Sequence, residues 1–473
     1  MTRTTRTLRF RYETAATRAA QAWEQFYLDN DGFYHEQRER ARAARGAVFA
    51  SYRLANNRNM PVWMTPEDLD RHAIVLGATG TGKSSLLERI ARLCFDTKRG
   101  GALLDPHGDL FTRTAAWARD AGVPDLTILD FTKPDQLPGW NPLKPLPGVD
   151  PGRQVDLLVG IFKRLYGDEE VKSWSYGVKA EEILRYSLRA CIESQTPATI
   201  DTMRSFLLIP ALRSSLLQTT SEEVRYYFHE RFSKREEMHV AAALNKLEPF
   251  LGSMAVQHFL GQPVSTVDPL AVMDRGGTLL VNLAKGYLGP TADILGRLIM
   301  NGLELGALRR EAIVPEKRVP YTLIVDEAHT FAGSDGALDV LLTAARKYRV
   351  SLVLAAQALA LFPTRFETLA LGNAGHHFFF RLSQQEAQKV APGLFEPQGN
   401  VPRVPVRAYD KVSDPYLTPA EEMRERAREL ADLPIGACYW AIKGRSYRGR
   451  RIQVSPPERA ALQRNLHRYS VVS

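Results

Sequence analysis

A glycine-rich octapeptide is the clearest chemical feature of the sequence. Residues 77–84 read Gly-Ala-Thr-Gly-Thr-Gly-Lys-Ser and match the pattern G-x-x-x-x-G-K-[ST]. Its glycines let successive backbone N–H groups curl around phosphates, and the N-terminus of a following helix attracts the same negative charge. We expect Lys83 to reach the β- and γ-phosphates and Ser84 to ligate Mg²⁺. The pattern predicts an ATP and Mg²⁺ site made by Gly77, Ala78, Thr79, Gly80, Thr81, Gly82, Lys83, Ser84 and Ser85.

An acidic pair supplies the second half of such a site. The apolar run Tyr321-Thr-Leu-Ile-Val325 leads directly into Asp326 and Glu327. A strand of an open α/β sheet carries its ligand-binding residues at its carboxyl end. We therefore expect Asp326 to hold Mg²⁺ through its water shell and Glu327 to take a proton from the attacking water as general base. The alternative interpretation is that both carboxylates are exposed to solvent at the strand end and have no catalytic role.

Residues 326–329, Asp-Glu-Ala-His, also spell the signature of DEAH-box helicases. Those enzymes need a short gap between the lysine and this string, followed by a second complete ATPase lobe. Here 243 residues separate Lys83 from Asp326, and 147 residues follow Asp326. That remainder is too short for a second lobe, so we interpret His329 as an ordinary polar residue.

Two further polar residues fit an ATPase plan. Gln357 follows the apolar run 350–354, where its amide could sense the γ-phosphate or its water. Arg346 lies in the predicted helix after the acidic pair, where a solvated helix face is the alternative interpretation. Asp105 is interpreted as a turn and helix cap, because Asp-Pro-x-Gly is strong turn chemistry. His376 and His377 have no Cys, Asp or Glu at ligand spacing, so they are predicted core or strand residues and no metal site.

The elements that must position these residues follow an α/β rhythm. Helical patterns are predicted over residues 12–55 and 84–97, and short buried strands separated by helices indicate a parallel, doubly wound sheet. The predicted strands are 73–76, 101–105, 126–130, 278–281, 321–325, 350–354 and 377–380. A Pro/Gly-rich stretch at 138–148 interrupts the rhythm, and the predicted helices beyond it are 155–166, 180–193, 224–232 and 240–251.

The expected domain organisation follows from these patterns. The predicted parts are a basic helical N-terminal segment at 1–60, the first part of the ATPase core at 61–150, an inserted all-α domain at 151–265, the second part of the core at 266–440, and a basic C-terminal tail at 441–473.

Charge is concentrated at the two ends of the 473-residue chain. The net charge is +9, of which residues 1–60 carry +5 and residues 441–473 carry +7. Basic ends on a near-neutral body suit a polyanionic partner, with nucleic acid first and an anionic membrane second. Solvated terminal arms are the alternative.

The remaining composition narrows the class of protein. Cys94, Cys191 and Cys438 have no paired spacing, which disfavours a zinc module or a disulfide framework. No apolar run reaches the ~18 residues of a membrane span, and no secretory signal is evident. We therefore expect a cytoplasmic protein without an intrinsic membrane span.

Taken in order, the motifs resemble the FtsK–HerA superfamily and are most similar to the TraG/TraD-type coupling proteins of conjugation and type IV secretion. The matching segments are 72–85, 104–110, Trp140-Asn-Pro-Leu143, 325–327, Arg346-Lys-Tyr348, 355–357 and 373–381, and the resemblance covers about residues 61–440. The chain departs from the usual pattern at its basic N-terminus, where coupling proteins carry transmembrane helices.

This resemblance implies a RecA-like core with an all-α insertion, a homo-hexameric ring and a central DNA channel. It also implies ATP hydrolysis at subunit interfaces, with Arg346 reaching into the neighbouring subunit's site; Arg349 and Arg381 are the other candidates for that arginine. The leading hypothesis is a DNA-translocating ATPase whose partners include a relaxase or a secretion-channel ATPase. The alternatives are an ATP-gated docking protein that recruits a relaxase or protein cargo without pumping, a soluble HerA-like motor, and a viral packaging motor.

Overall fold

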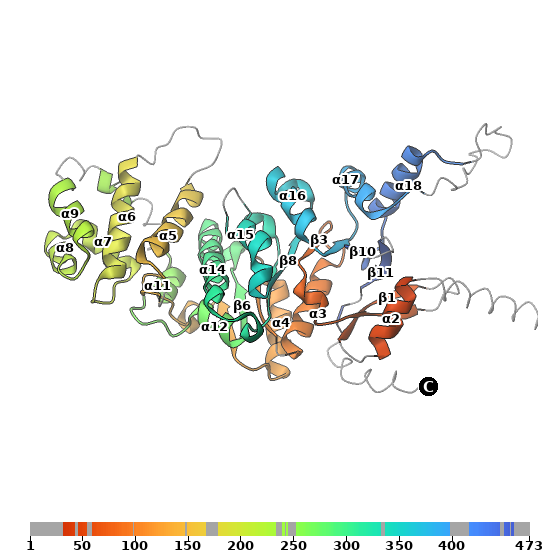
Figure 1. Cartoon of the computed structure of the whole chain (residues 1–473), viewed down its shortest axis with the longest axis horizontal. Helices are drawn as coiled ribbons and strands as arrows, with labels where there is room; N and C mark the ends of the chain where they lie inside the picture. Colours follow the sequence, from red (N-terminus) through yellow and green to blue (C-terminus); the bar gives the residue numbers. More distant parts are fainter. Residues whose placement is uncertain are drawn as a thin grey trace, which may run out of the picture. The chain divides into compact units, whose positions relative to one another are not determined.

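The computed structural model describes residues 32–42, 46–53, 59–97, 99–146, 149–166, 178–232, 239–241, 243–244, 252–332, 336–397, 416–444, 449–454 and 456–457. The chain divides into two compact units. Unit 1 consists of Met1–Thr97 and Val353–Ser473, and unit 2 of Lys98–Leu352. Figure 1 traces the chain from red at the N-terminus to blue at the C-terminus.

Unit 1 is built on a mixed sheet. Its strands, in spatial order, are β2 (Asn59–Met64), β1 (Ala47–Arg53), β11 (Arg450–Gln453), β10 (Ala437–Ile442), β9 (His376–Phe379), β3 (Ala73–Leu76) and the carboxyl part of β8 (Val350–Ala356). β3 pairs in parallel with β8 and β9. The outer strands β9, β10, β11, β1 and β2 pair antiparallel. All four residues of β3 are buried, as expected for an apolar strand between two parallel neighbours.

The prediction of helix over residues 12–55 is wrong for β1. Within that range α2 (Gly32–Arg42) is helical, whereas Ala47–Arg53 forms a strand; residues 12–31, 43–45 and 54–55 lie outside the described parts. Tertiary packing explains the strand, because β1 pairs with β2 along its length and packs Phe49 edge-on against the stacked rings of Phe378 and Trp440. Similarly, β11, in the range expected to be a basic tail, pairs with β10.

Unit 2 contains a parallel sheet in the order β7 (Tyr321–Val325), β4 (Gly100–Asp105), β6 (Thr278–Asn282) and β5 (Leu126–Asp130). Every residue of β4, β6 and β7 is buried. This sheet confirms the strands predicted at 101–105, 126–130, 278–281 and 321–325. The helices after or before these strands are α4 (Asp109–Asp120), α12 (Pro269–Arg275), α14 (Pro290–Arg309) and α15 (Ala337–Ala344).

Between β5 and β6 the described residues form helices and no strand of the sheet. Besides α12, these helices include α5 (Pro151–Tyr166), α6 (Val178–Glu193), α7 (Ile200–Leu208), α8 (Pro210–Leu217), α9 (Glu222–Tyr226) and α11 (Met254–Leu260). α6 contacts α7, α8 and α9, and these helices lie side by side in Figure 1. The predicted helix at 224–232 continues from α9 into a π-helical turn, Tyr227–Arg231. Of the helix predicted at 240–251, only residues 240–241 and 243–244 are described, and these are helical.

Unit 1 carries the helices α3 (Lys83–Asp96), α16 (Thr364–Asn373), α17 (Gln384–Leu394) and α18 (Pro419–Ala431). α3 begins at the lysine of the glycine-rich motif, so this motif connects β3 to a helix as its mechanism requires. Across the described parts of the chain, no helix combines the length and apolar character needed to cross a membrane.

Candidate nucleotide site

The phosphate loop (residues 77–84) is fixed to its surroundings by backbone hydrogen bonds. The Gly77 N–H donates to the carbonyl of Ala356 at 3.2 Å, and the Ala78 N–H donates to the carbonyl of Arg381 at 2.8 Å. On its other side, the Thr81 carbonyl accepts from the Gly436 N–H at 2.8 Å. The loop is therefore attached to the end of β8, to the residues after β9 and to the start of β10.

Glycine is required at three positions of the loop. Gly80 and Gly82 have φ angles of 75° and 118°, which residues other than glycine rarely adopt. At Gly77 the limit is space, because a Cβ there would lie 2.5 Å from the Cβ of Phe380. The conformation of the loop thus depends on this pattern of glycines.

Lys83 places a buried cation inside the loop. The residue is 7% exposed, and its Nζ donates to the carbonyls of Gly77 at 2.6 Å and Ala78 at 3.3 Å. The first turn of α3 contains no acidic residue, so nothing there offsets the positive end of the helix dipole. Ser84 and Ser85 are partly exposed in this turn, and Thr79 is exposed at the tip of the loop. This set of donors fits a polyphosphate, with Ser84 as the hydroxyl available to its metal ion.

Gln357 and Arg381 belong to the same unit as the phosphate loop. Gln357 is exposed and directly follows Ala356, whose carbonyl holds Gly77. Arg381 is held to Ala78 through its own carbonyl. The structure therefore brings both residues to the phosphate loop of their own chain.

The acidic pair ends β7 in unit 2. The Asp326 N–H donates to the carbonyl of Leu104 in β4 at 3.0 Å, and Asp326 Oδ1 accepts from the Glu327 N–H at 3.0 Å. Glu327 has a left-handed backbone, with φ 46° and ψ 48°. Asp326 and Glu327 are 8% and 9% exposed. Both carboxylates are therefore largely buried, in contrast to the solvent-exposed pair considered as the alternative. Burying a charge is costly unless the charge is paired or binds a metal ion, so this burial favours a functional role.

His329 lies beside Glu327, with 3.4 Å between His329 Nδ1 and Glu327 Oε2. Sequence reasoning assigns no role to this histidine. The only signal that could suggest one is its position two residues after the acidic pair.

Arg346 is exposed in a 3₁₀ turn, Ala345–Tyr348, at the end of α15. The sequence predicts a helix here, and the 3₁₀ turn ends at Arg349, which adopts a left-handed conformation with φ 57° before β8 begins. Arg349 donates through Nη1 to the carbonyl of Arg318 at 3.2 Å. The exposure of Arg346 is compatible with a solvated surface and with contact to another subunit.

Asp105 caps a turn, as predicted. Its carboxylate oxygens accept from the N–H groups of His107 at 2.9 Å and Phe111 at 2.8 Å. His376 is also a core residue, since its Nδ1 accepts from Trp440 Nε1 at 3.2 Å and burial lowers the pKa of its imidazole. Among the described residues, no group of three or more His, Cys, Asp or Glu side chains could hold a metal ion. The three cysteines are buried and unbridged.

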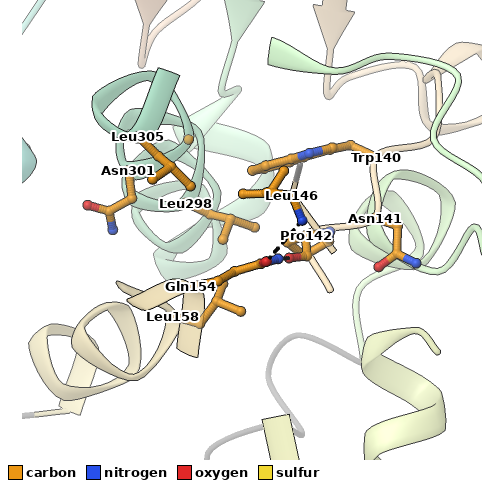
Figure 2. Close-up of a pocket in the computed structure, with 10 residues that line it drawn as sticks. Trp140, Asn141, Pro142, Leu146, Gln154, Leu158, Leu298, Asn301 and Leu305 are labelled. Atoms are coloured by element: carbon orange, nitrogen blue, oxygen red, sulfur yellow. Dashed lines mark hydrogen bonds between the residues drawn. The ribbon is translucent and has the colours of Figure 1, made fainter. Parts of the chain in front are cut away.

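Trp140, Asn141 and Pro142 join the sheet of unit 2 to its helices. Asn141 Nδ2 donates to the carbonyl of Ala198 at 2.8 Å, and Gln154 Nε2 of α5 donates to that of Pro142 at 2.8 Å. These residues and α14 line a cavity of 40 Å³, shown in Figure 2. That volume holds a few water molecules and is too small for a nucleotide.

Known proteins resemble this chain in part of its sequence and in its fold. Residues 53–253 match the family model of the HerA helicase central domain. The solved structure of the plasmid coupling protein TrwB in complex with ADP and Mg²⁺ superposes with a TM-score of 0.57 at 18% identity, covering 84% of this chain and 88% of that one. VirB4 of Thermoanaerobacter pseudethanolicus superposes with a TM-score of 0.54 at 14% identity, covering 88% and 96%.

No curated protein sequence matches the chain. The structural matches lie below 25% identity, and they establish the fold. With the phosphate loop and the acidic pair, they show a P-loop protein with a RecA-like α/β core. The match at residues 53–253 makes the chain similar to HerA-type ATPases, and its fold resembles that of the TraG/TraD-type coupling proteins.

Proposed function

We propose that this protein is a DNA-translocating ATPase of the conjugation or type IV secretion type. The observation that carries the proposal is the phosphate loop, which presents Lys83 and the start of α3 to one anionic ligand. ATP with Mg²⁺ is the ligand proposed, in keeping with the ADP and Mg²⁺ bound to TrwB. Gly77 to Ser85 bind the phosphates, and Ser84 and Asp326 hold the metal ion.

The proposed hydrolysis divides its work among residues of the chain. Glu327 accepts a proton from the attacking water, and Gln357 orients that water or senses the γ-phosphate. Lys83 stabilises charge on the phosphate oxygens, while Arg346 of an adjacent subunit adds a planar, permanently charged fork. The exposure of Arg346 supports this assignment, because an arginine that acts in trans must reach beyond its own chain.

DNA binding and assembly are the finer parts of the proposal. The +5 and +7 charges of residues 1–60 and 441–473 support a polyanionic partner. A homo-hexamer supplies the subunit interfaces at which Arg346 acts. The helices between β5 and β6 form the all-α insertion at 151–265, which divides a core made of 61–150 and 266–440. Relaxase or channel-ATPase contacts and cytoplasmic recruitment to the membrane face belong to the same proposal.

The decisive experiment measures ATP turnover by the full chain with and without DNA, beside Lys83→Ala as the inactive control. A motor is expected to hydrolyse ATP faster when DNA is added, and a triplex-displacement assay should report its movement. Turnover that ignores DNA but responds to a relaxase would refute translocation and favour the docking protein. Turnover by Lys83→Ala equal to wild type would refute the site itself.

A further inference from the structure

We infer that His329 is a positioning residue for Glu327, the proposed general base, and that the start of α14 holds His329 in place. The inference deepens the proposed function and rests on it. Its starting point is the separation of 3.4 Å between His329 Nδ1 and Glu327 Oε2. This separation is longer than that of a well-formed hydrogen bond, and such contacts of catalytic groups often shorten when the reacting complex forms.

The backbone fixes the approach of the two side chains. Glu327 is left-handed, and the 3₁₀ turn Ala328–Thr330 begins immediately after it. The Thr330 N–H closes this turn on the Glu327 carbonyl at 3.0 Å. His329 is the middle residue of the turn, so its ring returns to the carboxylate two residues earlier.

Helix α14 supports the turn at successive positions. Arg297 Nη2 donates to the Thr330 carbonyl at 3.1 Å. One residue earlier, Gly296 is packed so closely by Phe331 that an added Cβ would lie 2.3 Å from Phe331 Cε1. The turn carrying His329 is therefore held against α14 by a hydrogen bond and by close packing.

Burial favours the neutral form of His329 over the opposing charge of Glu327. Burial lowers the pKa of His329, Lys285 and His107 lower it further, and Glu327 and Asp293 oppose the shift. Lys285 is paired with Asp293 of α14 at 2.9 Å. A neutral imidazole can donate Nδ1–H to a carboxylate and fix its direction while leaving the negative charge that a base needs.

The test uses three substitutions that separate the donor from the bulk of the ring. The side-chain amide nitrogen introduced by His329→Asn takes nearly the place of Nδ1, whereas the one introduced by His329→Gln reaches the place of Nε2. We expect His329→Ala and His329→Gln to lower kcat roughly 10–100-fold, as loss of a group that orients a reacting side chain does. His329→Asn should retain most of the rate, and ATP affinity should change less than about twofold in all three.

A matched control and a double variant complete the design. His258 makes a comparable contact of 3.8 Å with Asp135, so His258→Ala should leave kcat unchanged. In a Glu327→Gln background, His329→Ala should cost less than about twofold, because a residue that acts through Glu327 has nothing left to position.

Three results would overturn the inference. They are a wild-type kcat for His329→Ala, equal losses of rate in His329→Asn and His329→Gln, and a full additional loss in the Glu327→Gln background. If Glu327→Gln itself retained the wild-type rate, the proposed base would be wrong and the inference about His329 would fall with it. If Glu327→Gln is slow and His329→Ala is not, the proposed function stands and only the inference fails.

Discussion

Replacing glycines of the phosphate loop by alanine separates backbone strain from crowding. Gly80 and Gly82 have φ angles of 75° and 118°, so an alanine is strained by about 1–2 kcal/mol at Gly80 and by at least as much at Gly82, whose φ lies further from the left-handed region. Around Gly80 nothing lies within 4 Å of an added Cβ, whereas at Gly82 it would lie 3.1 Å from Gly436 Cα and 3.1 Å from Phe380 Cε1. Gly82→Ala must therefore move Gly436, whose N–H donates to Thr81 at 2.8 Å.

At Gly82 the contacts of an added Cβ with Gly436 and Phe380 destabilise the folded state beyond the backbone strain. Moving Gly436 by a few tenths of an ångström weakens its hydrogen bond to Thr81 and disturbs the packing around it, which together cost about 1–2 kcal/mol. Gly82→Ala is thus expected to destabilise unit 1 by about 1–2 kcal/mol more than Gly80→Ala. For a unit of this size the difference corresponds to roughly 2–8 °C in Tm.

The assay is thermal unfolding of both variants and wild type without nucleotide, followed by far-UV circular dichroism at one scan rate. Omitting nucleotide matters because a ligand that binds only the folded state raises Tm by mass action. Equal Tm values for the two variants, or a lower value for Gly80→Ala, would refute the geometry of the loop against Gly436.

The other predictions concern turnover, DNA and assembly. Lys83→Ala should abolish ATP binding, whereas Glu327→Gln should bind ATP in an equilibrium assay but hydrolyse it roughly 10²–10⁴-fold more slowly; wild-type hydrolysis would exclude Glu327 as the base. Replacing Arg459, Arg464 and Arg468 by Ser should lower the slope of log affinity for duplex DNA against log salt by ~0.9 for each phosphate that is no longer neutralised, and an unchanged slope would place the DNA path elsewhere. Mixed oligomers of Arg346→Ala and Lys83→Ala subunits should regain part of the ATPase activity that each lacks alone; verified mixed oligomers that stay inactive would make Arg346 a surface residue.

The parts of the fold that can be predicted from sequence are those in which local pattern and tertiary environment agree. Residues 73–76 and 321–325 are continuous apolar runs followed by a recognisable motif, and both are buried parallel strands. β1 escapes such a prediction because it follows an arginine-rich stretch with a helical pattern. Its strand character comes from pairing with β2 and from aromatic rings of β9 and β10, about 330 and 390 residues further along the chain.

In the candidate site, too, some features can be predicted from the sequence and others cannot. The glycine pattern identifies the phosphate loop because its positive φ angles admit little else. The contact between His329 and Glu327 is not predictable, since it depends on a left-handed glutamate that no periodicity indicates. Arg346 is predicted in a helix, and the left-handed Arg349 that ends the turn is equally invisible to periodicity.

The bond between Thr81 and Gly436 has a consequence for biosynthesis. The Val454 N–H in turn donates to the Gly436 carbonyl at 2.7 Å. The phosphate loop is therefore supported by a residue that lies 373 positions after Thr81 in the chain. At ~5–20 residues per second, a ribosome needs roughly 20–75 s to synthesise that interval. During this time the nascent chain carries a glycine-rich loop without one of its supports. The loop therefore acquires all of its backbone supports only when β10 and β11 join the sheet.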